Sequence, residues 1–171
     1  MDKLKDKIRN IPDFPKAGIQ FKDITPLVKD PTSLRLAVLS LIAPFKDQNI
    51  TAIAGMEARG FIFGSIAAWE LGIGFIPLRK PGKLPYDVQS VAYSLEYGEA
   101  SLEAHVDAIK PGDRILLIDD LLATGGTAKA SCQLVEKLGG TVVACAFVIE
   151  LTSLNGREQI IDHPIHSLIQ Y

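Results

Sequence analysis

Two adjacent carboxylates stand directly before a glycine-rich turn, and these residue types in this order could do chemistry. Asp119 and Asp120 follow an apolar run, and residues 121–127 after them contain two glycines and two threonines. In such a turn the backbone N–H groups can close on an anion, and the helix that follows adds the partial positive charge of its N-terminus. The turn therefore predicts a phosphate cradle, made of Ala123, Thr124, Gly125, Gly126 and Thr127.

The acidic pair by itself is compatible with two interpretations. Asp119 and Asp120 could be acids at the end of a strand, with Thr124 serving the turn or capping the next helix. They could equally belong to a ligand site. The turn has neither the GxxxxGK(S/T) motif of nucleoside triphosphatases nor the GxGxxG motif of dinucleotide-binding proteins. The sequence therefore does not predict either of these two kinds of nucleotide site.

The segments around this turn predict an α/β protein. Apolar residues run through 114–120 and 141–150 as in buried strands, and the stretch between them has the period of a helix. Parallel units of this kind stack into an open sheet, and ligands bind beyond the carboxyl ends of its strands. The expected strands are 50–54, 75–78, 114–120 and 141–150, and the expected helices are 2–9, 34–45, 61–71 and 127–138.

Two other segments carry weaker signals. The helix expected over 34–45 is preceded by Pro31-Thr32-Ser33, which offers its cap. Residues 79–109 are interrupted by prolines and glycines and show no apolar face of helix length. A long, weakly patterned stretch of this kind often moves over a site, so we interpret it as a mobile insert.

Composition limits the class of protein. The chain has 171 residues, 18 basic and 20 acidic side chains, and a formal charge of −2. One domain, residues 1–171, is expected at this length. The charge balance argues against a nucleic-acid partner, and the apolar stretch 61–78 is broken by Glu70 and Pro77 and is no membrane span. Without an export signal, a cytoplasmic location with buried, reduced Cys132 and Cys145 is expected.

The string around the acidic pair, ILLIDDLLATGGT at 115–127, resembles the phosphoribosyl pyrophosphate signature of the type I phosphoribosyltransferases. Five further strings, in the right order, resemble the members of that family that use adenine. The family implies an α/β fold in one domain, with a central, mainly parallel sheet flanked by helices. It also implies a small base-binding hood at about 11–27 and a flexible catalytic loop at about 83–105. The matching strings are FPKAGIQFKDITP at 14–26, AGMEARGF at 54–61, RKPGKLP at 79–85, YSLEYG at 93–98 and ELTSLNGR at 150–157.

The resemblance implies how the donor, phosphoribosyl pyrophosphate, is held. Asp119 and Asp120 would bind the two ribose hydroxyls, while residues 123–127 take the 5′-phosphate. The pyrophosphate loop would lie at 57–60, with a non-proline cis peptide bond between its first two residues. A basic group would also reach pyrophosphate across the interface of a homodimer. The implied pyrophosphate residues are Glu57, Ala58, Arg59, Arg79, Lys80 and Lys83.

The resemblance places the base against Gln20, Phe21 and Lys22. In an extended segment the carbonyl of residue 20 and the N–H of residue 22 point along one edge and fit the donor and acceptor pair of adenine. Hypoxanthine and guanine present the opposite pair and would leave backbone groups unpaired. Phe21 would cover one face of the base and Leu151 the other. The chain departs from the family pattern at Ala17, where proline is usual, and at Lys22, where arginine is usual.

The implied reaction joins N9 of adenine to C1′ of the donor, with inversion, and yields AMP and pyrophosphate. The implied catalytic residues are Glu96, Asp119, Asp120 and Arg59. Glu96 would handle a proton near N7 of the base, and Tyr97 would lie beside it in the closing loop. Magnesium (Mg2+) would be held mainly by substrate and water, with no direct protein ligand.

Two other functions are compatible with parts of the sequence. The first is a phosphoribosyltransferase for another base, such as xanthine or orotate, against which the segments at 20–22 and 150–151 argue. The second is a regulator that senses phosphoribosyl pyrophosphate without catalysis. Such a regulator should lack Arg59 or Glu96 or show a basic face, and this chain keeps both residues with a slightly acidic balance.

A substitution of Glu96 tests its implied role. Glu96→Gln is expected to lower turnover by at least about tenfold with little change in donor affinity, because the amide keeps the size of the side chain but cannot carry the proton. Steady-state kinetics with adenine and donor varied separately measure both quantities. Unchanged turnover would remove Glu96 from the mechanism.

Overall fold

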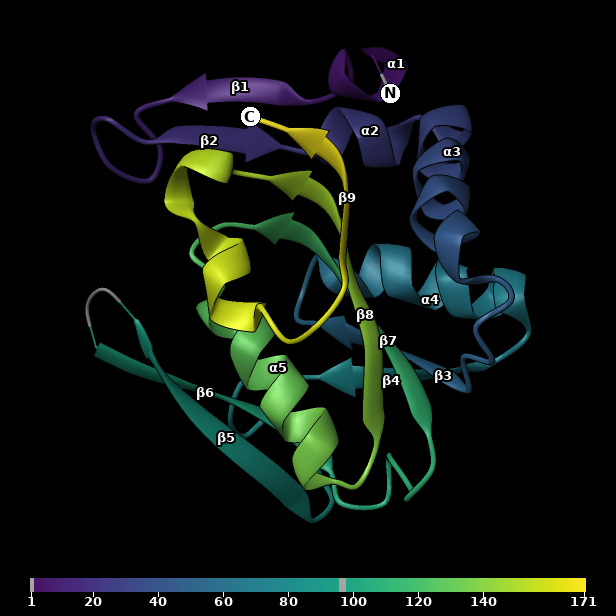
Figure 1. Cartoon of the computed structure of the whole chain (residues 1–171). Coiled ribbons are helices and arrows are strands. Elements are labelled where there is room, and N and C mark those ends of the chain that lie inside the picture. Colours follow the sequence, from purple (N-terminus) through teal and green to yellow (C-terminus); the bar gives the residue numbers. More distant parts are fainter. Residues whose placement is uncertain (1, 96–97) are drawn as a thin grey trace.

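The computed structural model describes residues 2–95 and 98–171, and a five-stranded parallel sheet runs through its middle. The strand order is β4, β3, β7, β8 and β9, and Gly55 of β3 pairs with Ile118 of β7. All five strands therefore end at the same edge of the sheet (Figure 1). The strands are β3 (Ala52–Met56), β4 (Gly74–Leu78), β7 (Arg114–Leu122), β8 (Thr141–Glu150) and β9 (Ile165–Gln170).

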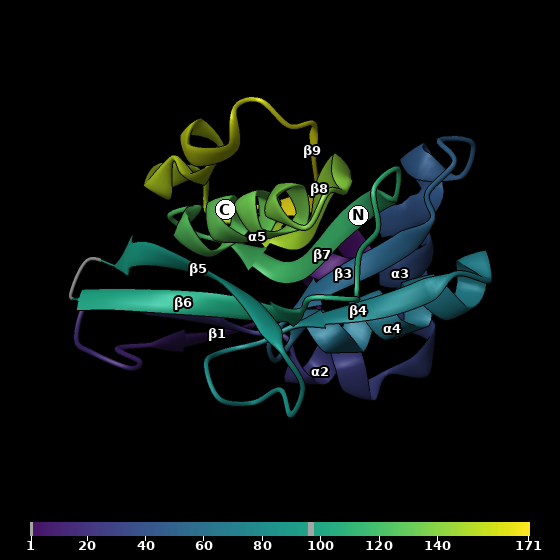
Figure 2. The ribbon, with the colours of Figure 1, turned by 90° about the horizontal axis from the view of Figure 1, so that it is seen from below.

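Each face of the sheet buries its own apolar cluster. Along β7, Leu116 and Ile118 belong to one cluster and Ile115 and Leu117 to the other, as the two-residue period of a strand requires. Figure 2 shows the sheet between α5 on one side and α3 and α4 on the other. The first cluster includes side chains of four helices, α1 (Asp2–Lys5), α2 (Thr25–Lys29), α3 (Pro31–Ile42) and α4 (Gly60–Leu71). The second cluster includes side chains of α5 (Gly126–Lys137) and β6 (Gly98–His105). Strand β6 forms an antiparallel hairpin with β5 (Val88–Leu95).

Short elements complete the chain around this sheet. An antiparallel ribbon is formed by β1 (Arg9–Pro12) and β2 (Gln20–Asp23). Two peptide bonds are cis, Phe14–Pro15 in the ribbon's connection and Glu57–Ala58 after β3, the second at the bond that the resemblance implied. The 3-10 helices are η1 (Ala43–Phe45), η2 (Thr152–Leu154) and η3 (Gly156–Ile160), of which the last two connect β8 to β9.

The units expected over 50–78 and 114–150 are confirmed, with limits within two residues of those observed. For the helix expected over 34–45, both the cap and the limits are wrong, because α3 begins at Pro31 and ends at Ile42, where η1 follows. Asp30 caps α3, and its carboxylate accepts a hydrogen bond of 2.9 Å from the N–H of Ser33. Pro31 occupies the first helical position, where its missing N–H costs nothing.

Other segments differ more from expectation. The first helix ends at Lys5, and Arg9 already belongs to β1. The insert over 79–109 contains a regular antiparallel hairpin, β5–β6, whose alternating pattern is weak because many of its residues are small or polar. The sequence predicted neither β1 nor β9, whereas β2 contains the segment at 20–22 that was expected to be extended. The movement of the loop at 83–105 and the limits of the hood at 11–27 stay predictions.

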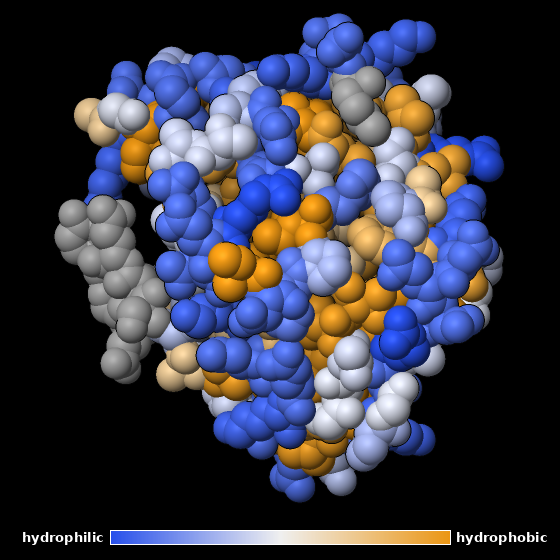
Figure 3. Space-filling view, in the orientation of Figure 1, coloured by the Kyte–Doolittle hydropathy of each residue, from blue (hydrophilic) through white to orange (hydrophobic). Residues whose placement is uncertain are grey.

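The described helices include none with the length and apolar character needed to cross a bilayer. Cys132 and Cys145 are buried free thiols, as expected, and their Sγ atoms lie 3.6 Å apart between α5 and β8. Figure 3 shows one face of the molecule, on which polar side chains predominate and apolar ones gather near the middle.

Candidate active site

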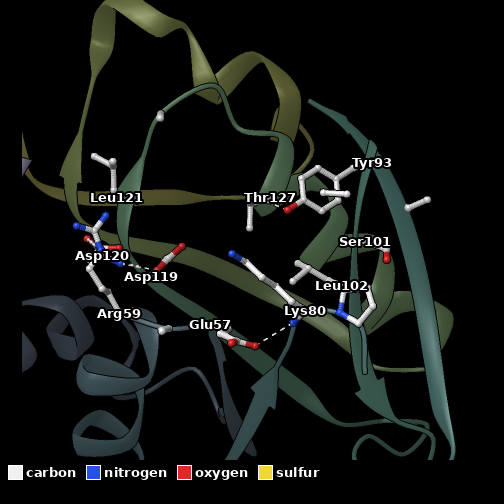
Figure 4. A pocket seen from close by; sticks show the side chains of 15 residues that line it. Glu57, Arg59, Lys80, Tyr93, Ser101, Leu102, Asp119, Asp120, Leu121 and Thr127 are labelled. Carbon is white, nitrogen blue, oxygen red and sulfur yellow. Dashed lines mark hydrogen bonds and ion pairs between the residues drawn. The ribbon is translucent and has the colours of Figure 1, made fainter. Parts of the chain in front are cut away.

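A pocket of about 740 Å³ opens beyond the ends of β3 and β7, and the β5–β6 hairpin forms its opposite wall (Figure 4). The structure thus brings together residues that are far apart in the sequence. The expected residues that line it are Glu57, Ala58, Arg59, Lys80, Asp119, Asp120, Ala123 and Thr127. The hairpin adds Ala92, Tyr93, Ala100, Ser101 and Leu102.

The acidic pair lies at the end of β7. Asp120 is 3% exposed, and its N–H donates a hydrogen bond of 2.8 Å to Oδ1 of Asp119. Burial raises the pKa of both carboxyls, the charge of Asp120 raises that of Asp119 further, and the Arg59 guanidinium opposes the rise. Ionising two adjacent carboxyl groups in a largely buried site costs free energy. Such perturbed acid pairs are typical of functional positions.

Arg59 supplies the counter-charge for this pair. Its Nε lies 2.9 Å from Oδ2 of Asp120 in an ion pair. No aligned hydrogen-bond donor reaches that oxygen among the described residues, although it is buried. A buried carboxylate oxygen without a hydrogen bond is poised to accept one from a ligand hydroxyl.

The glycine-rich turn forms a second, smaller hollow of about 80 Å³, next to Asp119 and lined by residues 121–128. Gly125 has φ +86° and directly precedes α5, so the turn leads into the N-terminus of a twelve-residue helix. A Cβ at Gly125 would lie 2.3 Å from the carbonyl oxygen of Gly156, so only glycine fits at this position. The helix N-terminus and the tight turn together suit a phosphate group.

The turn after β3 brings Glu57, Ala58 and Arg59 to the same edge. The carboxylate of Glu57 accepts a hydrogen bond of 3.0 Å from the N–H of Lys80 and lies 3.2 Å from Nε of Arg79. Burial opposes ionisation of Glu57, but these contacts outweigh it and lower its pKa. Glu57 therefore ties its own loop to the end of β4.

The three basic residues after β4 lie differently. Lys80 lines the pocket, and Figure 4 shows its side chain extending into it. The guanidinium of Arg79 is engaged by Glu57 and donates a hydrogen bond of 3.0 Å to the carbonyl of Lys83. Neither Arg79 nor Lys83 lines this pocket.

The residues expected to contact the nucleobase do not line this pocket either. Gln20, Phe21 and Lys22 are on β2, and Leu151 follows β8. Arg59 connects the two regions, because its guanidinium carbon lies 5.3 Å from the ring centre of Phe21 while its Nε pairs with Asp120.

Two expected residues, Glu96 and Tyr97, lie outside the described residues. Several residues that line the pocket were not predicted from the sequence, and Tyr93 is the one among them with a polar contact across the pocket. Tyr93 points across the pocket, with its hydroxyl 3.4 Å from Oγ1 of Thr127. The signal for it was available, because Tyr93 opens the string at 93–98 that carried part of the resemblance.

Comparison with known proteins agrees with this geometry. The family model of the phosphoribosyl transferase domain matches residues 36–168. An adenine phosphoribosyltransferase of Nitrosococcus oceani is 69% identical over 171 residues, all of both chains. The crystal structure of the adenine phosphoribosyltransferase of Rhodothermus marinus is 53% identical, with a TM-score of 0.95 over 99% of this chain and 97% of that one.

A third relative was solved with ligands. The adenine phosphoribosyltransferase of Saccharomyces cerevisiae, complexed with adenine and an imino-altritol bisphosphate, is 37% identical, with a TM-score of 0.92 over 98% of this chain and 97% of that one. The chain therefore belongs to the phosphoribosyltransferase family and, within it, to the adenine phosphoribosyltransferases, which are pentosyltransferases.

Proposed function

We propose that the pocket at the ends of β3 and β7 is the active site in which this chain transfers a phosphoribosyl group to N9 of adenine. The donor is phosphoribosyl pyrophosphate, and the products are AMP and pyrophosphate. The observation that carries the proposal is the meeting of a buried acidic pair, a phosphate-sized turn and Arg59 in one place. The three features match the ribose, the 5′-phosphate and the pyrophosphate of the donor.

Each part of the donor has a proposed partner. Asp119 and Asp120 accept hydrogen bonds from the ribose hydroxyls and place negative charge near the ring, where positive charge develops as the bond at C1′ breaks. The turn of residues 123–127 binds the 5′-phosphate through its N–H groups. Arg59 and Lys80 bind pyrophosphate, with Glu57 and Ala58 shaping the loop. Arg79 and Lys83 complete the basic group from the neighbouring segment.

Adenine lies between β2 and Leu151 in this proposal. Main-chain groups of Gln20 and Lys22 read its edge, Phe21 and Leu151 cover its faces, and Arg59 lies between this region and the donor pocket. The adenine bound in the yeast relative supports a base site in this fold. Glu96 and Tyr97 belong to the proposal through the family resemblance alone.

Mg2+ is proposed as the cofactor. The pocket's carboxylates, Asp119 and Asp120, are hard oxygen donors suited to magnesium-bound water. The described residues hold no cluster of three or more histidine, cysteine or acidic side chains that could form a metal cage. Donor oxygens and water are therefore the proposed ligands, and the metal, when bound, supplies positive charge to the leaving pyrophosphate.

A panel of bases tests the proposed function. Purified protein with Mg2+ and phosphoribosyl pyrophosphate is offered adenine, hypoxanthine, guanine, xanthine or orotate, and nucleotide formation is measured. We expect AMP from adenine and little product from the others, because the edge pattern of adenine is reversed in hypoxanthine and guanine. Preference for another base would contradict the proposed base site. Donor binding without any product would favour a regulator.

The acidic pair leads to a prediction that couples stability to pH. The folded chain holds a proton on Asp119 more tightly than the unfolded chain does, because burial raises its pKa. Stability is therefore lost as pH rises from the unfolded-state pKa, about 4, through the raised folded-state value. Asp119→Asn is expected to melt at a higher temperature than the wild type at pH 7, with the difference vanishing near about pH 3.

The same substitution should weaken donor affinity by about 10- to 100-fold, the range for one charged hydrogen bond. Thermal unfolding at the two pH values and calorimetric titration with the donor measure the two effects. Asp47→Asn, in the exposed turn after η1, is the matched control and should change neither. A variant less stable than the wild type at pH 7 would show that the Asp119 charge stabilises the fold.

We also propose a homodimer that uses the outer surface of α3 and α4. Trp69 on α4 is 85% exposed and Leu36 on α3 is 44% exposed. A groove between the two helices is lined by five apolar residues and two charged ones, namely Pro31, Leu34, Val38, Leu39 and Ile66 with Arg35 and Glu70. Large exposed apolar side chains grouped around a groove mark interaction surfaces. Helix α4 forms part of this surface, and its first residue, Gly60, is the last residue of the proposed pyrophosphate loop.

The dimer proposal predicts a mass. Light scattering should give twice the 18.5 kDa of one chain for the wild type and about one chain mass for Trp69→Glu, because a charge at the centre of an apolar interface is costly to bury. Ile161→Glu, at another strongly exposed apolar position between η3 and β9, should leave the mass unchanged. A monomeric wild type would overturn the proposal.

A further inference from the structure

Tyr171 contacts both segments that the proposed function assigns to adenine. Its ring centre lies 3.7 Å from Nζ of Lys22 on β2. Its main chain is fixed at the other segment, because its N–H donates a hydrogen bond of 3.0 Å to the carbonyl of Glu150 and its carbonyl oxygen accepts one of 2.9 Å from the N–H of Thr152. Oγ1 of Thr152 donates a second bond, of 2.7 Å, to the same oxygen.

These bonds place Tyr171 in a bridging position. Three hydrogen bonds hold its backbone on either side of Leu151, and one cation–π contact holds its ring against β2. Figure 1 marks this chain end after β9, on the side of the molecule where β2 lies. The two proposed walls of the base site, Phe21 and Leu151, are thus connected through Tyr171.

The ammonium of Lys22 has two contacts among the described residues. The ammonium is close to the ring, and Nζ also donates a hydrogen bond of 3.2 Å to Oδ1 of Asn10 on β1. A second ammonium, that of Lys5, lies 4.7 Å from the same ring centre. Burial and the charge of Lys5 lower the pKa of Lys22. The negative face of the ring therefore compensates two cations that repel each other.

We propose that Tyr171 is a positioning residue for adenine, which fixes β2 at the distance from Leu151 that admits one flat base. This inference rests on the proposed function of the site. The side chain of Lys22 is occupied by Tyr171 and Asn10, so that it acts as the anchor of β2, and the adenine edge is left to the main chain of the segment. Tyr171 does not line the donor pocket, so its effect should fall on adenine and not on the donor.

The test compares the Michaelis constants of the two substrates in matched variants. Tyr171→Leu removes the ring, and Lys22→Met removes the cation from the other side of the same contact. Each should raise the KM for adenine by about threefold to tenfold, the range for loss of one cation–π contact, with the KM for the donor within about twofold of wild type. Tyr171→Phe keeps the ring and should restore the KM for adenine. Lys5→Met, which removes a cation from the same ring but is not on β2, should not raise it.

The outcomes separate this inference from the function on which it rests. An equal rise in the KM of both substrates, or a fall in kcat alone, would mean a general structural role and would overturn it. An unchanged KM for adenine in both Tyr171→Leu and Lys22→Met would overturn it while the proposed function stood. A wild type that makes no AMP would instead contradict the proposed function. If Tyr171→Leu does not fold, Lys22→Met decides alone.

Discussion

The parallel pairing of β3 with β7 is the constraint on which the rest of the site depends. Because Gly55 lies opposite Ile118, the turn of residues 57–59 that follows β3 lies at the level of Asp119 and Asp120 in β7, and both line the same pocket. The ion pair between Arg59 and Asp120 then joins the two turns. Without that guanidinium, Asp120 would lose its ion pair, and ionisation of two adjacent carboxylates in a buried position would be less favourable.

Close backbone packing makes this arrangement rigid. The phosphate turn lies against the segment after β8, where Gly125 meets Gly156 with no room for a Cβ on either. The nearly buried carboxylate of Glu150 accepts hydrogen bonds from Nε and Nη2 of Arg157, at 2.5 and 2.7 Å, and this fork closes the segment into a loop. Because the Glu150 carboxylate is buried, paired and hydrogen-bonded, it favours this one conformation of the loop over others.

The sequence predicted the parts of the fold that have strong local patterns. The strands and helices of the two units around the site follow from apolar periodicity, and the acidic pair and its turn follow from residue type. The β5–β6 hairpin was missed because its pattern is weak and its pairing depends on contacts with α5 and β4. The cap at Asp30 was missed because the proline after it was taken as part of the cap.

The site shows the same division. Asp119, Asp120 and the turn could be named from residue type and order, since adjacent residues in a turn stay together in the fold. Arg59 was named through the family resemblance. Tyr93 opens one of the strings that carried the resemblance, but its contact with Thr127 could not be predicted, because the hairpin brings its hydroxyl there. The family resemblance also named the segment at 20–22 as the one that contacts the base. It did not indicate that Tyr171 would contact the Lys22 side chain.

The two halves of the proposed site have different physical origins. The donor half is built at the end of a parallel sheet, so its geometry is set by the most buried part of the protein. The base half is built from a two-stranded ribbon that is marginal by itself and depends on neighbours for its position. At position 22, where the resemblance implied arginine, the lysine ammonium lies over the ring of Tyr171, and a guanidinium makes the same kind of contact with an aromatic ring. In the proposed site, base recognition therefore depends on where the ribbon is held, and less on which cation holds it.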